Sequence, residues 1–147
     1  MQTDALDSAV CLAKALAHPT RLRIAAMLDR GPLCVCQLTA LFEAASSTIS
    51  AHLLELRRAG VVRETKQGKW VEYRLHDEAA VLGVLTPLLA IANQDELLAA
   101  DLARLREVTS IPAAVLCEAG LDLTRALKAA RRRPPTTRPR AAAGLRA

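Results

Sequence analysis

The sequence predicts a mainly α-helical domain with one β-hairpin, in the order α-α-α-α-β-β-α, followed by a C-terminal helical extension. Two patterns predict this order: apolar residues recur at helical spacing over most of the chain, and the period changes to two over about 61–75. Aromatic residues make up only 2% of a chain that is 52% hydrophobic. Leu, Ala and Val must therefore build the core, which favours packed helices.

Four helices are expected before the period changes. Their predicted spans are Asp4 to Ala17, Pro19 or Thr20 up to the break at Gly31-Pro32, Leu33 or Cys34 to Phe42, and Ser46 or Ser47 to Ala59. In each span the apolar residues fall at intervals of three and four. Gly31-Pro32 and Gly60 supply the stop signals after the second and fourth helices.

A β-hairpin follows, from Val61 to Lys66 and from Lys69 to Leu75, with the turn at Gln67-Gly68. Further helices are predicted from Glu78 to Asn93, with Asp77 as its cap and a kink at Pro87, and from Asp95 to Val108. One more is predicted within Ile111 to Ala130.

The chain of 147 residues therefore divides into three predicted parts. Residues 1–93 form a domain that contains the first five helices and the hairpin, residues 94–130 the helical extension, and residues 131–147 a disordered basic tail. The net charge of +5 belongs to the C-terminus, because 128–147 holds seven basic residues and no acidic ones. Evidence for nucleic-acid binding must therefore come from local clusters in the folded part.

Such a cluster lies in the fourth helix and the hairpin, which follow one another as in a winged helix-turn-helix. Short hydroxyl side chains at the start of this helix suit phosphate contacts and a close approach to base edges. Between Ser46 and Leu75 there are six basic residues against three acidic ones. The predicted DNA-binding residues are Ser46, Ser47, Thr48, Ser50, His52, Arg57, Arg63, Lys66 and Lys69.

Four cysteines are the other candidate functional residues: Cys11, Cys34, Cys36 and Cys117. The N-terminus lacks a secretory signal and no apolar run is long enough to span a bilayer, so a cytoplasmic location is expected, with no membrane partner. In that reducing compartment the cysteines are not expected to form a structural disulfide framework. Metal binding, redox sensing and burial are the alternatives.

Cys34 and Cys36 are predicted to lie in the first turn of the third helix, where the positive end of the helix dipole is expected to lower a thiol pKa. Residues two apart on a regular helix point about 200° apart. Two sulfurs so placed cannot both reach one small ion, so ligand binding is expected to distort this turn and displace the DNA-reading helix.

Four segments resemble the ArsR/SmtB family of metalloregulatory repressors, and specifically its arsenical-resistance repressors. They are ALAHPTRLRIAAML (15–28), LCVCQL (33–38), SSTISAHLLELRRAGVV (46–62) and QGKWVEYRL (67–75). The resemblance implies a homodimer, formed through the first and fifth helices, that leaves a palindromic operator when As(III) or Sb(III) binds Cys34 and Cys36. It implies no resident cofactor and no small-molecule substrate.

One departure from the family pattern concerns the ligand set. Arsenic repressors of one type carry a third cysteine three residues after the second, and Thr39 stands there in this chain. Cys11, from the partner subunit, and Cys117 are candidates for the third ligand, and each fits burial without a ligand role as well. Binding of a methylated trivalent arsenical by two thiols is the other possibility.

Three rival functions are open from the sequence. The first is a repressor of the same fold that senses oxidants through its thiols, or Cd or Zn; the predicted fifth helix, however, lacks the His ligands of zinc-sensing relatives. The second is an enzyme, which is not expected because no C-x-x-C pair, phosphate loop or acid pair is present. The third is an interaction module of the same shape that binds no DNA.

Overall fold

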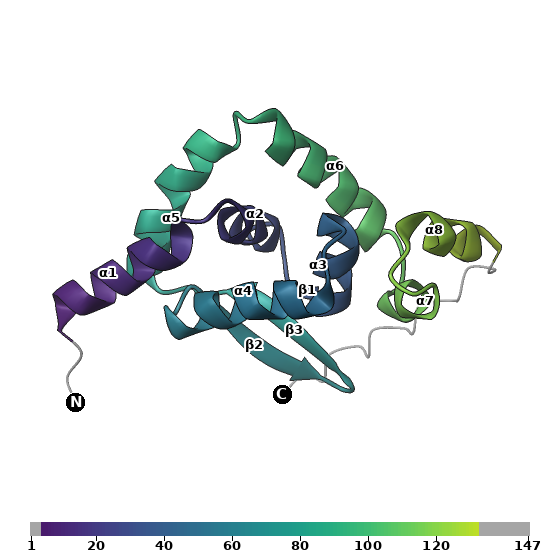
Figure 1. Ribbon diagram of the computed structural model, residues 1–147, viewed down its shortest axis with the longest axis horizontal. Helices are drawn as coiled ribbons and strands as arrows, with labels where there is room; N and C mark the ends of the chain where they lie inside the picture. Colours follow the sequence, from purple (N-terminus) through teal and green to yellow (C-terminus); the bar gives the residue numbers. More distant parts are fainter. Residues whose placement is uncertain (1–3, 133–147) are drawn as a thin grey trace, which may run out of the picture.

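The structure, a computed structural model, describes residues 4–132. Its helices are α1 (Ala5–Leu16), α2 (Pro19–Leu28), α3 (Val35–Phe42), α4 (Ser46–Arg58), α5 (Ala79–Ala92), α6 (Glu96–Thr109), α7 (Ala113–Glu118) and α8 (Leu123–Arg132). The strands are β1 (Leu33–Cys34), β2 (Val62–Gln67) and β3 (Trp70–Leu75). The predicted winged helix-turn-helix is confirmed (Figure 1).

The central element is α3, which packs against α4, α6 and α7. One continuous core joins these helices to α2 and to the base of the hairpin. Its fully buried large side chains include Ile24, Met27, Leu38, Leu41, Ile49, Leu53, Leu56 and Leu116. Residues 96–132 therefore share one core with the helix-turn-helix.

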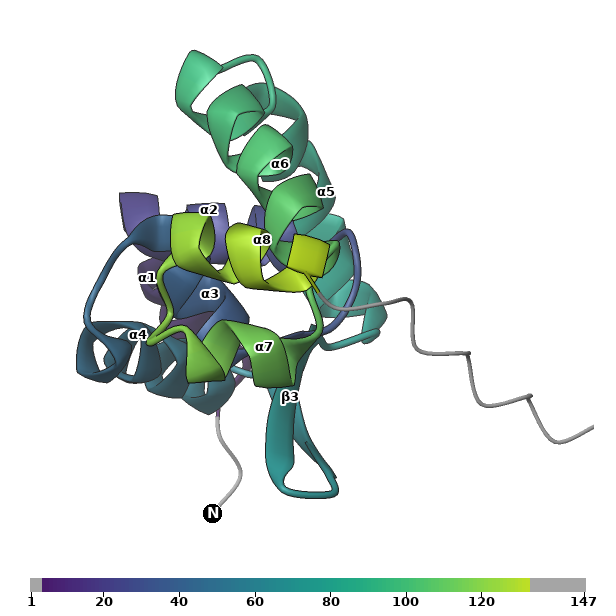
Figure 2. The ribbon, with the colours of Figure 1, turned by 90° about the vertical axis from the view of Figure 1, so that its right-hand side faces the viewer.

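A short strand, β1, precedes α3 and was not predicted. It pairs antiparallel with β3, so that Leu33 lies opposite Tyr73 and Cys34 opposite Glu72. The sheet has the order β1-β3-β2. The tip of the hairpin extends beyond the helices (Figure 2). Farther from the tip, β3 of the hairpin pairs with β1, which leads directly into α3.

The C-terminal prediction of one helix within Ile111 to Ala130 is wrong, because two helices occupy this segment. Gly120 and Leu121 both adopt positive φ values, 66° and 64°, which no continuous right-handed helix allows. The second helix, α8, continues through Arg132, two residues into the predicted disordered tail. The remainder of that tail, 133–147, lies outside the described residues.

Two helix starts also differ from the prediction. Helix α3 begins at Val35, so that Cys34 is its N-cap residue with an extended backbone. Helix α5 begins after Glu78, and the backbone N–H of Glu78 donates to Nδ1 of His76. Asp77, the predicted cap, instead lies 3.6 Å from the guanidinium of Arg63.

Within the described residues, no single helix has the length and hydrophobicity needed to cross a membrane. Helices α5 and α6 meet the length and composition criteria only when taken together, and a bend of 104° separates them.

Candidate nucleic-acid interface and thiol site

Helix α4 presents its predicted polar side chains to solvent. Ser46, Ser47, Thr48 and Ser50 are exposed, while Ile49, Leu53 and Leu56 on the opposite face are buried. Ala45, the N-cap residue, makes no side-chain cap hydrogen bond. The first turn of α4 therefore offers hydroxyls beside backbone N–H groups, a combination suited to phosphate oxygens.

His52 is half-buried, and its ring stacks at a tilt on His18, with 4.6 Å between the ring centroids. His18 is itself fixed, because its Nδ1 accepts a hydrogen bond from the backbone N–H of Thr20 at the start of α2. Burial, followed by the nearby His18 and Arg21, lowers the pKa of His52. His52 is thus a neutral side chain at the contact between α4 and α2 at neutral pH.

The two predicted arginines are engaged in ion pairs. Arg57 donates to Glu64 at 2.6 Å, and the Tyr73 hydroxyl donates to the other oxygen of the same carboxylate at 3.1 Å. Arg63 faces Asp77. These contacts join the end of α4 to the hairpin and to the start of α5. Glu64 and Tyr73 were not among the predicted site residues, although the Glu64 carboxylate anchors Arg57 and Tyr73 orients that carboxylate.

The hairpin tip carries the unpaired positive charge. Lys66 and Lys69 are exposed and form no ion pair within 4–132. The ammonium group of Lys69 lies 5.8 Å from the centroid of the Trp70 ring. Figures 1 and 2 show this hairpin projecting on the side of the molecule where α4 lies. The two elements that carry the predicted DNA-binding residues therefore lie on one side of the molecule.

The four cysteines are free thiols, and the structure brings three of them to the region where α3 begins. Cys117, on α7, donates a hydrogen bond to Cys36, with 2.9 Å between the sulfur atoms. Cys34 is buried at 5% exposure, whereas Cys36 and Cys117 are half-buried. Cys11 is exposed on α1, beside Arg21 and Glu55 and away from α7 (Figure 1).

Both thiols at the start of α3 are harder to ionise than a free cysteine. Burial raises the pKa of Cys34. Burial, and then the hydrogen bond and charge repulsion from Cys117, raise the pKa of Cys36 to about 11. The expectation that the helix N-terminus would lower these pKa values is wrong, because burial raises them by more than the hydrogen bonds at the start of the helix lower them. The thiols are therefore protonated at neutral pH.

Cys34 is held by its backbone. It pairs with Glu72 in the sheet, and its N–H donates to the side-chain oxygen of Gln37 at 2.9 Å. This contact follows the pattern of an N-terminal residue and a Gln three positions later, which the sequence contains as C-x-x-Q. Because Cys34 precedes the helix, the 200° separation expected for two helical residues does not apply. Within 4–132, no three His, Cys, Asp or Glu side chains are positioned together to hold a metal ion.

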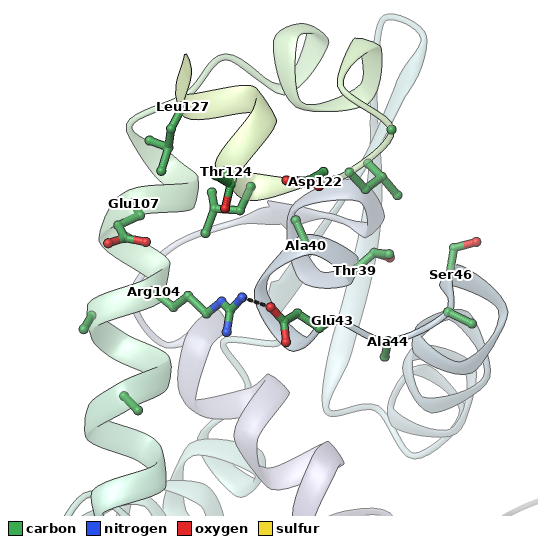
Figure 3. A pocket seen from close by; sticks show the side chains of 16 residues that line it. Thr39, Ala40, Glu43, Ala44, Ser46, Arg104, Glu107, Asp122, Thr124 and Leu127 are labelled. Carbon is green, nitrogen blue, oxygen red and sulfur yellow. Dashed lines mark hydrogen bonds and ion pairs between the residues drawn. The ribbon is translucent and has the colours of Figure 1, made fainter. Parts of the chain in front are cut away.

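A second feature lies at the other end of α3. A cavity of about 830 Å³ separates the α3–α4 turn from α6 and from the start of α8. Glu43 in that turn adopts a left-handed conformation, with φ of 50°, and forms an ion pair with Arg104 of α6 at the cavity wall (Figure 3). Thr39 also lines the cavity, and its buried hydroxyl has no hydrogen-bond partner among residues 4–132.

Comparison of the sequence with known proteins finds similarity to bacterial regulators of one family. The family model described as "Bacterial regulatory protein, arsR family" matches residues 18–64. The arsenic resistance transcriptional regulator ArsR1 of Pseudomonas putida is 42% identical over 106 residues, which cover 67% of this chain and 78% of that protein. The arsenical resistance operon repressor of Escherichia coli is 48% identical over 65 residues, 44% of this chain and 56% of that protein. The chain thus spans only about half of this second relative.

Solved structures agree with the fold. HlyU from Vibrio cholerae has a TM-score of 0.55 and 34% identity, covering 62% of this chain and 97% of that one. BigR from Xylella fastidiosa, described as a transcriptional repressor, has a TM-score of 0.54 and 28% identity, covering 62% and 90%. A homodimeric winged helix-turn-helix DNA-binding domain from Mycobacterium bovis has a TM-score of 0.55 and 26% identity, covering 65% and 92%.

Proposed function

Because this chain belongs to the ArsR family, whose members are transcription regulators and not enzymes, we propose that it is a homodimeric repressor of arsenical-resistance genes. In this proposal the dimer binds a palindromic operator and leaves it when As(III) or Sb(III) binds the Cys34 and Cys36 thiolates. The observation that carries the proposal is the position of these thiols, at the junction of β1 and α3, between the hairpin and the helix-turn-helix.

The DNA-binding part rests on α4 and the hairpin. The hydroxyl side chains at the start of α4 and the unpaired Lys66 and Lys69 are all exposed to solvent. In a helix-turn-helix protein the N-terminal residues of the second helix read base edges in the major groove, and basic side chains fix the register on the phosphates. We assign Ser46, Ser47, Thr48 and Ser50 to the groove and the lysines to the backbone. Such a protein acts where operator DNA lies, in the cytoplasm.

The dimer interface is proposed on α1 and α5. Leu6, Val10, Leu82, Val84 and Ile91 on these helices are large apolar side chains left exposed in the single chain. A second copy of the chain would remove this surface from water, at about 25 cal/mol per Å² of apolar area. The homodimeric Mycobacterium bovis domain supports this state of assembly.

The inducer class follows from the ligand atoms. Thiolates are soft ligands that select soft ions over hard, oxygen-seeking ones, and the names of two relatives refer to arsenic and arsenical resistance. The proposed path from this site to DNA has two branches. Cys34 is paired with β3 of the hairpin, and Cys36 is part of α3, which packs on α4. A shift at the thiols therefore displaces both DNA-contacting elements.

The test is an operator titration followed by fluorescence anisotropy. Arsenite and antimonite are expected to release the wild-type protein from DNA, and the C34S/C36S double variant is expected to stay bound at the same inducer concentration. Zinc and cadmium serve as comparison ions. Release of the double variant by arsenite, or a wild-type protein that responds only to zinc, contradicts the proposal.

A second candidate function is favoured by the distance between Cys36 and Cys117. Two thiols in contact at 2.9 Å are placed for oxidation by a hydroperoxide. Each sulfur would lose a proton and one electron, a disulfide would form, and the O–O bond would be cleaved to give water and an alcohol, or two waters from hydrogen peroxide. Operator release by peroxide, with arsenite inert, would favour this oxidant-sensing repressor.

A further inference from the structure

The contact between Cys36 and Cys117 joins two elements that are far apart in the sequence. The residues are separated by 81 positions, and their sulfur atoms are 2.9 Å apart. The contact is set by packing, because α7 lies against α3 and its Val115 and Leu116 are buried in the common core. The thiol of Cys117 is thereby presented to the start of the helix-turn-helix.

The thiols of Cys34, Cys36 and Cys117 differ in their exposure to solvent. Cys36 and Cys117 are half-buried, whereas Cys34 is only 5% exposed. Cys34 is also fixed by its pairing with Glu72 and by the hydrogen bond to Gln37. A ligand that arrives from solvent therefore meets the pair first, and the buried Cys34 joins after it.

We propose that Cys36 and Cys117 form the dithiol that first captures trivalent arsenic or antimony, and that subsequent binding of Cys34 transmits the signal to the hairpin. This inference rests on the metalloid-responsive function proposed above. It assigns the third ligand to the C-terminal extension of the same chain, and it leaves Cys11 outside the site.

The number of exchangeable hydroxyl groups on the arsenic atom determines how many cysteines an inducer can bind. For each thiol that binds, an As–S bond forms and an As–O bond breaks, and the thiol proton leaves with the hydroxyl group as water, with no change in oxidation state. Arsenous acid has three exchangeable hydroxyls and can engage all three cysteines. Methylarsonous acid has only two, because its As–C bond does not exchange, so the accessible dithiol consumes both.

The two compounds should therefore separate binding from DNA release. Methylarsonous acid is expected to occupy Cys36 and Cys117 while Cys34 stays in β1, so that the β1–β3 pairing and the hairpin keep their positions. Arsenous acid is expected to draw Cys34 out of β1 and to disturb the strand opposite it, at Glu72.

The experiment uses the full chain, with native mass spectrometry for binding and operator anisotropy for release. Wild type, C117S, C34S and C11S are each titrated with arsenite and with methylarsonous acid, and circular dichroism verifies that every variant folds. Cys11 is the matched control, because it is a free, exposed cysteine away from α7. For C117S, the affinity for both compounds should fall by more than the roughly 10- to 100-fold that loss of an outer-shell partner costs.

C34S should still bind both compounds but should stay on the operator when they are added. C11S should behave as wild type. Methylarsonous acid should bind the wild-type protein but release little of it from the operator. If C117S binds the arsenicals and is released from the operator as the wild-type protein is, the assignment of Cys117 is wrong, but the proposed metalloid-responsive repressor is not contradicted. Release of C34S by arsenite, or full release of wild type by methylarsonous acid, overturns the role of Cys34. A wild-type protein that binds neither compound refutes both proposals.

Discussion

Arg23 of α2 donates two hydrogen bonds to Asp101 of α6, from Nε at 2.7 Å and from Nη2 at 2.8 Å. The carboxylate is buried, with Asp101 only 4% exposed, and the same guanidinium lies 4.8 Å from the ring centroid of Phe42 at the end of α3. One side chain therefore ties the C-terminal helices to both α2 and the end of α3, the segment that supports α4.

Loss of this pair should destabilise the whole domain. Replacement of Asp101 by Asn leaves a charged, partly buried Arg23 without its counter-ion, and removal of one partner of a buried pair costs about 3–5 kcal/mol. Because Arg23 is partly exposed, we expect a value at the lower end of this range. The free energy of unfolding, measured with urea, should decrease by about 3 kcal/mol. The control is E55Q, which breaks an exposed pair with Arg58 and should cost less than about 1 kcal/mol. Equal effects of the two substitutions would contradict this interpretation of the pair.

The proposed dimer interface can be tested with one charge on α5. Ile91 is 70% exposed in the single chain, and I91E would place a carboxylate in the apolar contact with the partner. We expect a shift from dimer to monomer in analytical ultracentrifugation at micromolar concentration. L97E is the matched control, because Leu97 is a 51% exposed apolar residue on α6, outside the proposed interface. If I91E remains dimeric, the dimer interface does not include this part of α5.

The hairpin lysines should contribute to DNA binding without selecting sequence. The K66A/K69A variant is expected to weaken binding to operator and to random DNA by a similar factor. The slope of log K against log salt should become shallower by about one for each phosphate that the variant no longer neutralises. K128A, which removes an exposed lysine of α8, should leave the slope unchanged. If operator binding alone weakened, the lysines would be reading bases.

His52 gives a prediction for acid pH. Its pKa is lowered in the folded protein by burial, His18 and Arg21, so the unfolded chain binds more protons than the native state as the pH falls through about 6.5. The free energy of unfolding should therefore decrease on going from about pH 7.5 to about pH 5.5, and H52N should reduce this decrease. Titration of the His52 ring by NMR checks the direction, and a midpoint above the ordinary histidine value would contradict it.

The sequence predicted the helix-turn-helix and its hairpin because each element there is long enough to show its period. Strand β1 was missed because two residues cannot show an alternation, and its partner in β3 is about forty positions away. The break between α7 and α8 was missed because the left-handed backbone includes Leu121, an apolar residue that carries no turn signal.

The candidate site was predicted only in its residue types. The cysteines and hydroxyl residues were identified, but the contact between Cys36 and Cys117 depends on how α7 folds back onto α3, which no local pattern encodes. The directions of the thiol pKa shifts were also missed, because helix position was known and burial was not. Likewise, the pairing of Arg57 with Glu64 depends on the tertiary position of the hairpin beside α4.

The chain contains one tryptophan, Trp70, and it stands at the start of β3 beside the lysine-bearing tip. Along the same strand, Glu72 is only two residues away, opposite Cys34. Indole emission from the unlabelled protein thus has a single source, located between the proposed thiol centre and the proposed DNA contact. Its intensity can be followed on mixing with operator and then with arsenite, so that the order of thiol binding, strand movement and DNA departure is resolved in time without an added dye.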